Sequence, residues 1–117
     1  MDTTERISIA AAETLIFSAL TAQGVDDVPA RSVALSLVAA EAEGQSGHGF
    51  SRLNDYIAQV QSGKINGRAN ITCRMDSETS VIADADCGFA YPALDQAITW
   101  GIRIAKSSGT ATMSICN

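Results

Sequence analysis

Hydrophobic positions in the first half of the chain recur every three to four residues, which is the spacing of amphipathic helices. The first stripe comprises Leu15, Ile16, Ala19 and Leu20. The second and most regular stripe comprises Ala30, Val33, Ala34, Leu37 and Val38. The third stripe comprises Leu53, Tyr56, Ile57 and Val60. Together the three stripes predict three consecutive helices.

A glycine-rich loop interrupts this helical pattern. Residues 44–49 read Gly-Gln-Ser-Gly-His-Gly, and three glycines in six residues leave too much backbone freedom for a helix to continue. The second helix should therefore stop by Gly44. We expect the third helix to begin near Gly49 or Phe50 and to end at Ser62-Gly63.

After Asn66-Gly67 the hydrophobic period changes from 3.6 residues to two, which indicates β-structure. Apolar and polar side chains alternate from Ile71 to Met75, and this alternation predicts a strand. The sequence Asp76-Ser77-Glu78 favours a turn into a second strand, Thr79–Ala83. The two strands are predicted to form a β-hairpin.

A fourth helix and a last strand complete the pattern. Pro92 favours a helix start and Gly109 a helix end. The predicted buried stripe of this helix comprises Leu94, Ala97, Ile98, Gly101, Ile102 and Ala105. Alternation then returns from Thr110 to Cys116. The order strand, helix, strand predicts a right-handed crossover that places the last strand parallel to a neighbour.

These elements predict a mixed α+β fold. Three helices occupy the helical part, residues 1–67, and a β-hairpin, a helix and a strand in residues 68–117 begin a larger sheet. We interpret residues 1–117 as a single domain, because this length suits one small hydrophobic core. The last strand is apolar and reaches Asn117 without polar padding. We therefore expect a truncated domain whose open strand edge favours association, most simply in a homodimer.

Composition and charge exclude several classes of partner. The chain has 117 residues, 46% hydrophobic and 18% charged, which is typical of globular proteins. Eight Lys and Arg against thirteen Asp and Glu give a net charge of −5, which disfavours nucleic acid and anionic membranes. No apolar run approaches the roughly 20 residues of a membrane span, and no signal peptide pattern opens the sequence. We expect a cytoplasmic protein.

Cysteine and aspartate positions give little support for a metal site. The three cysteines, Cys73, Cys87 and Cys116, are widely spaced without a CxxC motif, so we expect reduced, half-buried thiols rather than disulfides or zinc ligands. Asp84-Ala85-Asp86 offers two carboxylates, but no second ligand cluster accompanies them. We interpret these aspartates as turn residues and predict no metal.

The most informative residue is His48, the only histidine, which lies between two glycines that let the backbone approach a ligand closely. His48 and Arg52 are four positions apart, so at a helix start they can project to one side of the first turn. Arg52 can clamp the carboxylate of a small 2-oxo or 2-hydroxy acid, while the imidazole exchanges the proton of the adjacent oxygen. Tyr56, one turn further, can add a hydroxyl.

Two other interpretations of this loop stay open. In the first, His48 is a solvated loop residue, Arg52 pairs with a surface charge such as Glu41, and Tyr56 belongs to the core. In the second, the glycines bind a nucleotide phosphate. The phosphate hypothesis is disfavoured because residues 44–49 follow a helix instead of a strand and lack a Gly-Lys-Ser/Thr sequence.

The order of several short motifs resembles the malate/L-lactate dehydrogenase family, the second, non-Rossmann type of NAD(P)-dependent oxidoreductase. The motifs are Ala39-Ala40-Glu41-Ala42-Glu43-Gly44, His48-Gly49-Phe50-Ser51-Arg52-Leu53, Ser62-Gly63-Lys64-Ile65-Asn66 and Val81-Ile82-Ala83-Asp84-Ala85-Asp86-Cys87-Gly88. The resemblance covers nearly the whole chain.

This resemblance implies that His48 is the proton-transfer histidine and Arg52 the substrate-carboxylate arginine. It also implies NAD or NADP as cofactor, bound in a non-Rossmann fold and partly across a dimer interface, and it identifies no cofactor-binding residue here. Gly47 stands where the family usually has a serine, and Gln45 where it often has a histidine.

Family members are longer, so we expect the N-terminal portion of an enzyme that interconverts 2-hydroxy and 2-oxo acids, with the acid/base residue present and most of the cofactor site absent. The alternative hypothesis is a non-catalytic helical module that works by association.

Overall fold

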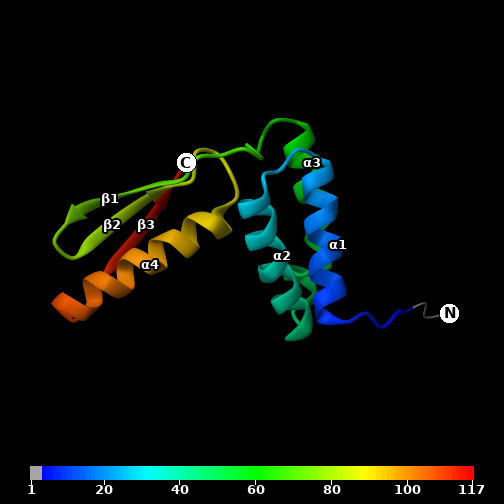
Figure 1. Ribbon diagram of the computed structural model, residues 1–117, viewed down its shortest axis with the longest axis horizontal. Coiled ribbons are helices and arrows are strands. Elements are labelled where there is room, and N and C mark those ends of the chain that lie inside the picture. Colours follow the sequence, from blue (N-terminus) through cyan, green and yellow to red (C-terminus); the bar gives the residue numbers. More distant parts are fainter. Residues whose placement is uncertain (1–3) are drawn as a thin grey trace.

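The computed structural model describes residues 4–117, which form a mixed α+β fold of two lobes (Figure 1). One lobe contains only helices, and the other is a sheet covered by a helix. The helices are α1 (Ile9–Ala22), α2 (Asp27–Ala42), α3 (Leu53–Gln61) and α4 (Ala90–Ser108), with short 3₁₀ helices η1 (Ser46–His48) and η2 (Phe50–Arg52). The strands are β1 (Thr72–Ser77), β2 (Ser80–Asp84) and β3 (Thr112–Cys116). The predicted order of elements is confirmed.

The helical lobe is built on the contact between α1 and α2, which carries most of its buried side chains. On α1 the buried line is Ala12, Ile16 and Leu20, one residue every turn. The predicted inclusion of Leu15 is wrong, because this side chain is 52% exposed. Gly24 has a left-handed φ of +86°, as expected for the residue after a helix.

The sheet has the strand order β1-β2-β3 within the described residues. β1 and β2 form the predicted antiparallel hairpin, with an irregular register between Met75 and Ser77. β3 lies parallel to β2, as the strand-helix-strand order predicted. The α4 helix covers the face of the sheet that carries the buried side chains of Val81 and Ala83 (Figure 1).

The buried face of α4 differs from the predicted one. Small side chains meet the sheet, and the buried residues are Pro92, Ala93, Ala97, Gly101 and Ile104. A side chain at Gly101 would collide with Met113 of β3, so the helix lies close to the strands along this line. As a result the larger side chains of Leu94, Ile98 and Ile102 point away from the sheet and are 42%, 40% and 53% exposed.

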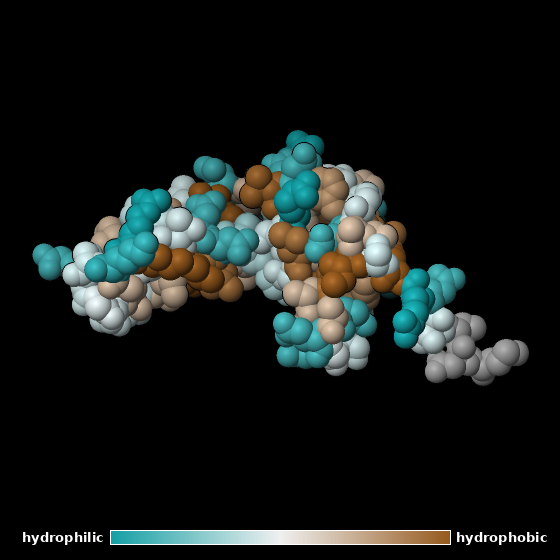
Figure 2. Space-filling view, turned by 60° about the horizontal axis from the view of Figure 1, so that its bottom comes forward, coloured by the Kyte–Doolittle hydropathy of each residue, from teal (hydrophilic) through white to brown (hydrophobic). Residues whose placement is uncertain are grey.

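These exposed side chains contribute to a hydrophobic band on the lobe that α4 and the sheet form (Figure 2). Met113 and Ile115 of β3, which are 42% and 40% exposed, add apolar surface to the same lobe. Isolated apolar residues are common on protein surfaces, but a contiguous band indicates an interaction surface. In the part of the chain that the structure describes, no helix is long and apolar enough to cross a membrane.

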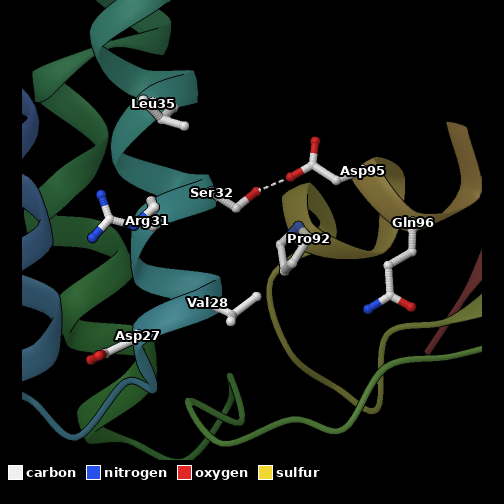
Figure 3. A pocket seen from close by; sticks show the side chains of 8 residues that line it. All are labelled: Asp27, Val28, Arg31, Ser32, Leu35, Pro92, Asp95 and Gln96. Atoms are coloured by element: carbon white, nitrogen blue, oxygen red, sulfur yellow. Dashed lines mark hydrogen bonds between the residues drawn. The ribbon is translucent and has the colours of Figure 1, made fainter. Parts of the chain in front are cut away.

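A polar contact joins the two lobes between α2 and α4. The buried Ser32 hydroxyl donates a hydrogen bond to the Asp95 carboxylate, and both side chains point into the space between the helices (Figure 3). An open groove of about 420 Å³ lies beside this bond. A buried hydroxyl needs such a partner, so the Ser32–Asp95 bond helps to set how the two lobes meet.

Candidate functional site

The loop that carries His48 consists of two tight turns instead of the start of an α-helix. The η1 turn ends at His48, η2 spans Phe50–Arg52, and α3 begins only at Leu53. Between the two turns Gly49 has φ −103° and ψ −131°, which interrupts the helical backbone. The prediction that His48 and Arg52 share the first turn of one α-helix is therefore wrong, and they lie on successive short turns.

Glu41 of α2 holds this loop against the helical lobe. Its carboxylate accepts a hydrogen bond of 3.0 Å from the backbone N–H of Phe50. Gly49 is buried against the same carboxylate, and a β-carbon at this position would collide with it. The close approach therefore requires glycine at position 49. Glu41 bonds Phe50, so the surface charge that Arg52 pairs with is Asp55 instead of Glu41, while the rest of that alternative, an exposed His48 and a Tyr56 packed on the core, agrees with the structure.

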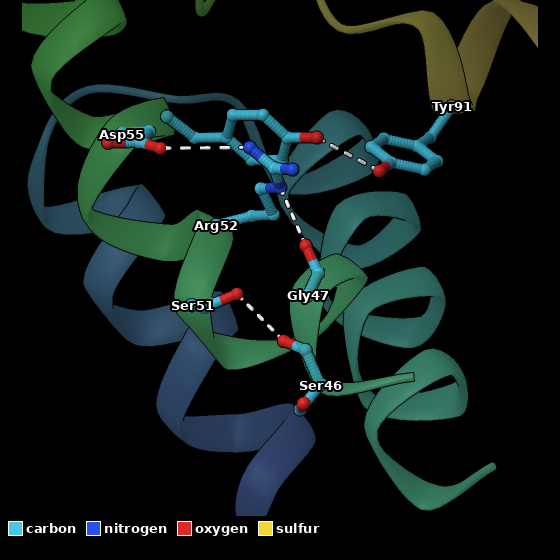
Figure 4. A network of polar contacts seen from close by, with 7 residues as sticks. Ser46, Gly47, Ser51, Arg52, Asp55 and Tyr91 are labelled. Atoms are coloured by element: carbon cyan, nitrogen blue, oxygen red, sulfur yellow. Dashed lines mark hydrogen bonds and ion pairs between the residues drawn. The ribbon is translucent and has the colours of Figure 1, made fainter. Parts of the chain in front are cut away.

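The Arg52 side chain folds back over its own loop. Its Nε donates a hydrogen bond of 2.8 Å to the carbonyl oxygen of Gly47, and its Nη1 lies 3.9 Å from Asp55 Oδ2 (Figure 4). Both members of this ion pair are well exposed, at 45% and 65%, so their attraction is weak. The guanidinium is thus oriented by Gly47 through Nε, and its Nη groups, of which Nη1 has only the weak ion pair with Asp55, can bind a carboxylate.

A second hydrogen bond fixes the outer turn of the loop. The Ser51 hydroxyl donates to the carbonyl oxygen of Ser46 at 2.7 Å (Figure 4). His48 is exposed, and its backbone N–H donates to the Gln45 carbonyl oxygen at 2.9 Å. The imidazole therefore projects from a backbone that several local bonds hold, and it is open to a ligand from solvent.

Tyr56 lies on α3, four residues after Arg52, and is half-buried against the core. Its hydroxyl is 3.0 Å from the hydroxyl of Tyr91, and its ring packs edge-on against Phe89 at 5.5 Å between ring centroids. Burial and the bond to Tyr91 raise the pKa of Tyr56 from 10.0 to about 12, against a lowering effect of Arg52. Tyr56 is therefore a neutral hydrogen-bonding group at physiological pH.

The segment after β2 is a turn, as the sequence predicted. The Asp84 carboxylate accepts from the Asp86 backbone N–H at 2.8 Å, and Asp86 accepts from Asn70 N–H at 2.9 Å. Asp86 and Cys87 have left-handed φ values of 52° and 57°. Both carboxylates are thus occupied by backbone donors. Among residues 4–117, no cluster of three or more His, Cys, Asp or Glu side chains could hold a metal ion.

The cysteines differ in part from the expectation. All three are free thiols; Cys73 is half-buried as predicted, whereas Cys87 and Cys116 are exposed. Burial raises the pKa of Cys73. This shift disfavours the thiolate and indicates a thiol of low reactivity.

Residues 85–89 do not form a binding site for a dinucleotide phosphate. A phosphate-binding glycine loop would connect a strand to a helix, as residues 85–89 do between β2 and α4. However, Gly88 packs tightly there, and a β-carbon would lie 3.0 Å from the Ala85 carbonyl oxygen and 3.2 Å from the Asn66 carbonyl oxygen. Gly88 therefore serves chain packing, and this loop is not a phosphate-binding glycine loop.

The roles of two residues near the site could not be predicted from the sequence. The sequence offers Glu41 as a partner for Arg52 and as part of a family motif, but its bond to the Phe50 N–H follows from neither. Tyr91 is separated from Tyr56 by 35 residues, and no local spacing connects them. Only the packing of α4 against the helical lobe brings Tyr91 to this position.

The fold is mixed α+β, and His48 and Arg52 lie on the loop that links α2 to α3. A known protein family matches this chain. The family model described as malate/L-lactate dehydrogenase matches residues 7–117. The chain therefore belongs to the malate/L-lactate dehydrogenase family.

Named relatives include two kinds of enzyme. A (2R)-3-sulfolactate dehydrogenase (NADP(+)) of Chromohalobacter salexigens is 39% identical over 110 residues, which are 93% of this chain and 32% of the relative. A Delta(1)-pyrroline-2-carboxylate reductase of Ancylobacter novellus is 33% identical over 115 residues, 98% of this chain and 34% of the relative. The chain thus spans about a third of the length of these curated relatives.

The fold agrees with the solved structure of a carboxylate reductase. The crystal structure of delta1-piperideine-2-carboxylate reductase from Pseudomonas syringae pv. tomato superposes with a TM-score of 0.92 at 28% identity. The match covers 96% of this chain and 34% of that one. The arrangement of helices and strands described above is therefore the fold of this part of a family member.

Proposed function

We propose that this chain supplies the substrate-binding and proton-transfer part of an NAD(P)-dependent oxidoreductase that interconverts small 2-hydroxy and 2-oxo acids. The observation that carries the proposal is the Arg52 guanidinium, which Gly47 holds on the loop that also presents His48. An oriented cation and an exposed imidazole on the same loop suit a substrate whose reacting carbon is next to a carboxylate.

Each residue has one role in this proposal. The Nη groups of Arg52 bind the C1 carboxylate, because Nε is already used by the Gly47 carbonyl oxygen. His48 gives its proton to the C2 oxygen as C2 receives a hydride, so a 2-oxo acid becomes a 2-hydroxy acid; in the reverse direction the imidazole removes that proton. Tyr56 adds a neutral hydroxyl near Arg52.

NAD or NADP, when bound, supplies or accepts the hydride. The relative from Chromohalobacter salexigens is named as an NADP(+) enzyme, which supports this cofactor class. The chain itself contributes substrate binding and proton transfer to the reaction.

A second substrate class has specific support. Relatives named as pyrroline or piperideine carboxylate reductases act on a C=N bond next to a carboxylate, and one of them has the solved fold with a TM-score of 0.92. The proposed roles of Arg52 and His48 transfer to such a substrate, because the carboxylate is the same and the proton goes to nitrogen in place of oxygen. A cyclic imino acid is therefore the second candidate substrate.

The functional surroundings are also proposals. We propose that the protein is a homodimer, because the α4 lobe exposes the apolar side chains of Leu94, Ile98 and Ile102. We propose a cytoplasmic location, because three free thiols, two of them exposed, suit a reducing compartment. We further propose that the chain is one domain divided into a helical part, residues 1–67, and a sheet part, residues 68–117.

The experiment is a reduction assay with the purified whole protein, using NADH and NADPH in turn. The panel contains sulfopyruvate, oxaloacetate, pyruvate and Δ1-pyrroline-2-carboxylate. We expect oxidation of one cofactor with at least one 2-oxo acid. Turnover of the imine alone would favour the second candidate, and no turnover of any substrate would favour the non-catalytic association module.

A further inference from the structure

The hydroxyls of Tyr56 and Tyr91 form a pair that links the two lobes beside the proposed substrate site. Tyr56 lies on α3 and Tyr91 in the first turn of α4, and their oxygens are 3.0 Å apart (Figure 4). This distance is that of a normal hydrogen bond, in which either hydroxyl can be the donor.

Aromatic packing holds both oxygens in place. The Tyr56 ring packs edge-on against Phe89 at 5.5 Å and against Tyr91 at 6.3 Å between centroids. Phe89 is only 3% exposed, so this group is anchored in the core. The rings therefore cannot turn their hydroxyls away without breaking core contacts.

The proton count of the pair leaves one donor free. Two phenols carry two O–H hydrogens, and their mutual bond uses one of them. Among residues 4–117, neither hydroxyl has another side-chain or backbone partner. Whichever tyrosine donates, the other keeps an O–H hydrogen for a third group, so the pair presents one free donor.

The neighbouring charge indicates which group that donor meets. Arg52 lies directly before α3, four residues before Tyr56, and its charge lowers the pKa of Tyr56. A carboxylate has about four lone-pair positions, and the two Nη groups of Arg52 use two of them. A neighbouring O–H can fill a third position.

We propose that the Tyr56 and Tyr91 hydroxyls act as one hydrogen-bond donor to the carboxylate that Arg52 binds, which makes Tyr91 a further substrate-binding residue. This inference rests on the proposed function and deepens it. It assigns a contact to α4 that the loop motif does not contain. The bond between the two hydroxyls strengthens the free donor, because a hydroxyl that takes part in a chain of hydrogen bonds is polarised.

The test uses Tyr91→Phe, Tyr56→Phe and the double variant, each of which removes hydroxyls and keeps the rings. Each single variant should raise the KM of the best 2-oxo acid by about 3- to 10-fold, the scale of one lost hydrogen bond, with kcat within about twofold. Because the pair acts as one donor, the KM of the double variant should rise by less than the product of the two single-variant increases. The Kd of oxamate, a carboxylate ligand that the enzyme cannot reduce, should rise in parallel.

A matched control is Thr99→Val, which removes a hydroxyl that bonds the Asp95 carbonyl oxygen on the same helix. It should leave KM and the oxamate Kd unchanged. Unchanged KM and oxamate Kd in Tyr91→Phe, with an active wild-type protein, would overturn the inference and leave the proposed function standing. Fully multiplicative effects of the two single variants would overturn it too. A wild-type protein without turnover on any substrate would instead refute the proposed function, and the inference with it.

Discussion

The guanidinium Nε of Arg52 donates a hydrogen bond of 2.8 Å to the carbonyl oxygen of Gly47, five residues earlier. This bond turns the arginine back over the loop and leaves its two Nη groups to bind a ligand. Gly47, where the family resemblance implies a serine, contacts Arg52 through its backbone carbonyl oxygen. The loop thus orients its own cation through main-chain geometry.

Replacing Arg52 by Lys should weaken substrate binding more than chemistry. An ammonium group cannot bond the Gly47 carbonyl oxygen and also hold a carboxylate with two parallel N–H groups. We expect the KM of the 2-oxo acid to rise by roughly 10- to 100-fold, as for the loss of a charge-assisted bidentate pair. Steady-state kinetics measure this change, with Arg103→Lys as an exposed control on α4. If KM stays the same, Arg52 has a structural role only.

Gly49 and Gly47 should respond differently to the same substitution. A methyl group at position 49 collides with the Glu41 carboxylate and displaces it from the Phe50 N–H, whereas a methyl group at position 47 meets nothing within 4 Å. Gly49→Ala should therefore lower the free energy of unfolding by about 1–3 kcal/mol, the cost of a broken partly buried bond, and should reduce activity.

Gly47→Ala is the matched control and should leave stability within about 0.5 kcal/mol of the wild type. Chemical denaturation of both variants measures the difference. Equal stability of the two would show that Glu41 does not hold the loop.

Alkaline titration should reveal the raised pKa of Tyr56. Tyr56 keeps its proton up to a pKa of about 12, while an unfolded tyrosine ionises at 10.0. Between these values the folded protein binds more protons than the unfolded chain, so the free energy of unfolding should fall as pH rises from 10 to 12 and be unaffected by Tyr56 below 10.

Tyrosinate absorbance follows this ionisation directly. The late step should disappear in Tyr56→Phe and move to lower pH in Tyr91→Phe, because the bond to Tyr91 helps to raise the Tyr56 pKa. If the late step survives in Tyr56→Phe, the raised pKa belongs to another residue.

The hydrophobic band on α4 should control association. Ile98→Asp and Ile102→Asp each place a charge on exposed apolar surface, so they should shift a dimer toward monomers without unfolding the chain. Light scattering at micromolar concentration measures the change. Gln96→Asp, at an exposed polar position of the same helix, is the control and should leave the mass unchanged. A wild-type monomer would contradict the proposed homodimer.

The periodicity of apolar residues predicted most of this fold, because helices and strands have fixed repeats of 3.6 and two residues. It was less reliable for which face is buried. On α4, Ala97 and Ile98 both fit a stripe of buried residues. The close approach of Gly101 to β3 turns the face with small residues toward the sheet, so Ala97 is buried and Ile98 is exposed.

The sequence proposes residues for the site but not their geometry. His48 and Arg52 are candidates from residue type, spacing and family resemblance, whereas the backbone angles of Gly49 that separate their turns depend on contact with Glu41. Tyr91 depends on packing between lobes that are distant in sequence. Local pattern contains no information on such a contact.

The most direct measurement of the central claim is the turnover of His48→Ala in the whole protein, compared with Asn54→Ala at an exposed position of α3. If His48 transfers the proton at the substrate oxygen, its removal should lower kcat by roughly two to four orders of magnitude, while Asn54→Ala stays close to the wild type. A loss of less than about threefold in His48→Ala, well below the range of general acid–base catalysis, would contradict the assignment of this chain as the proton-transfer part of the enzyme.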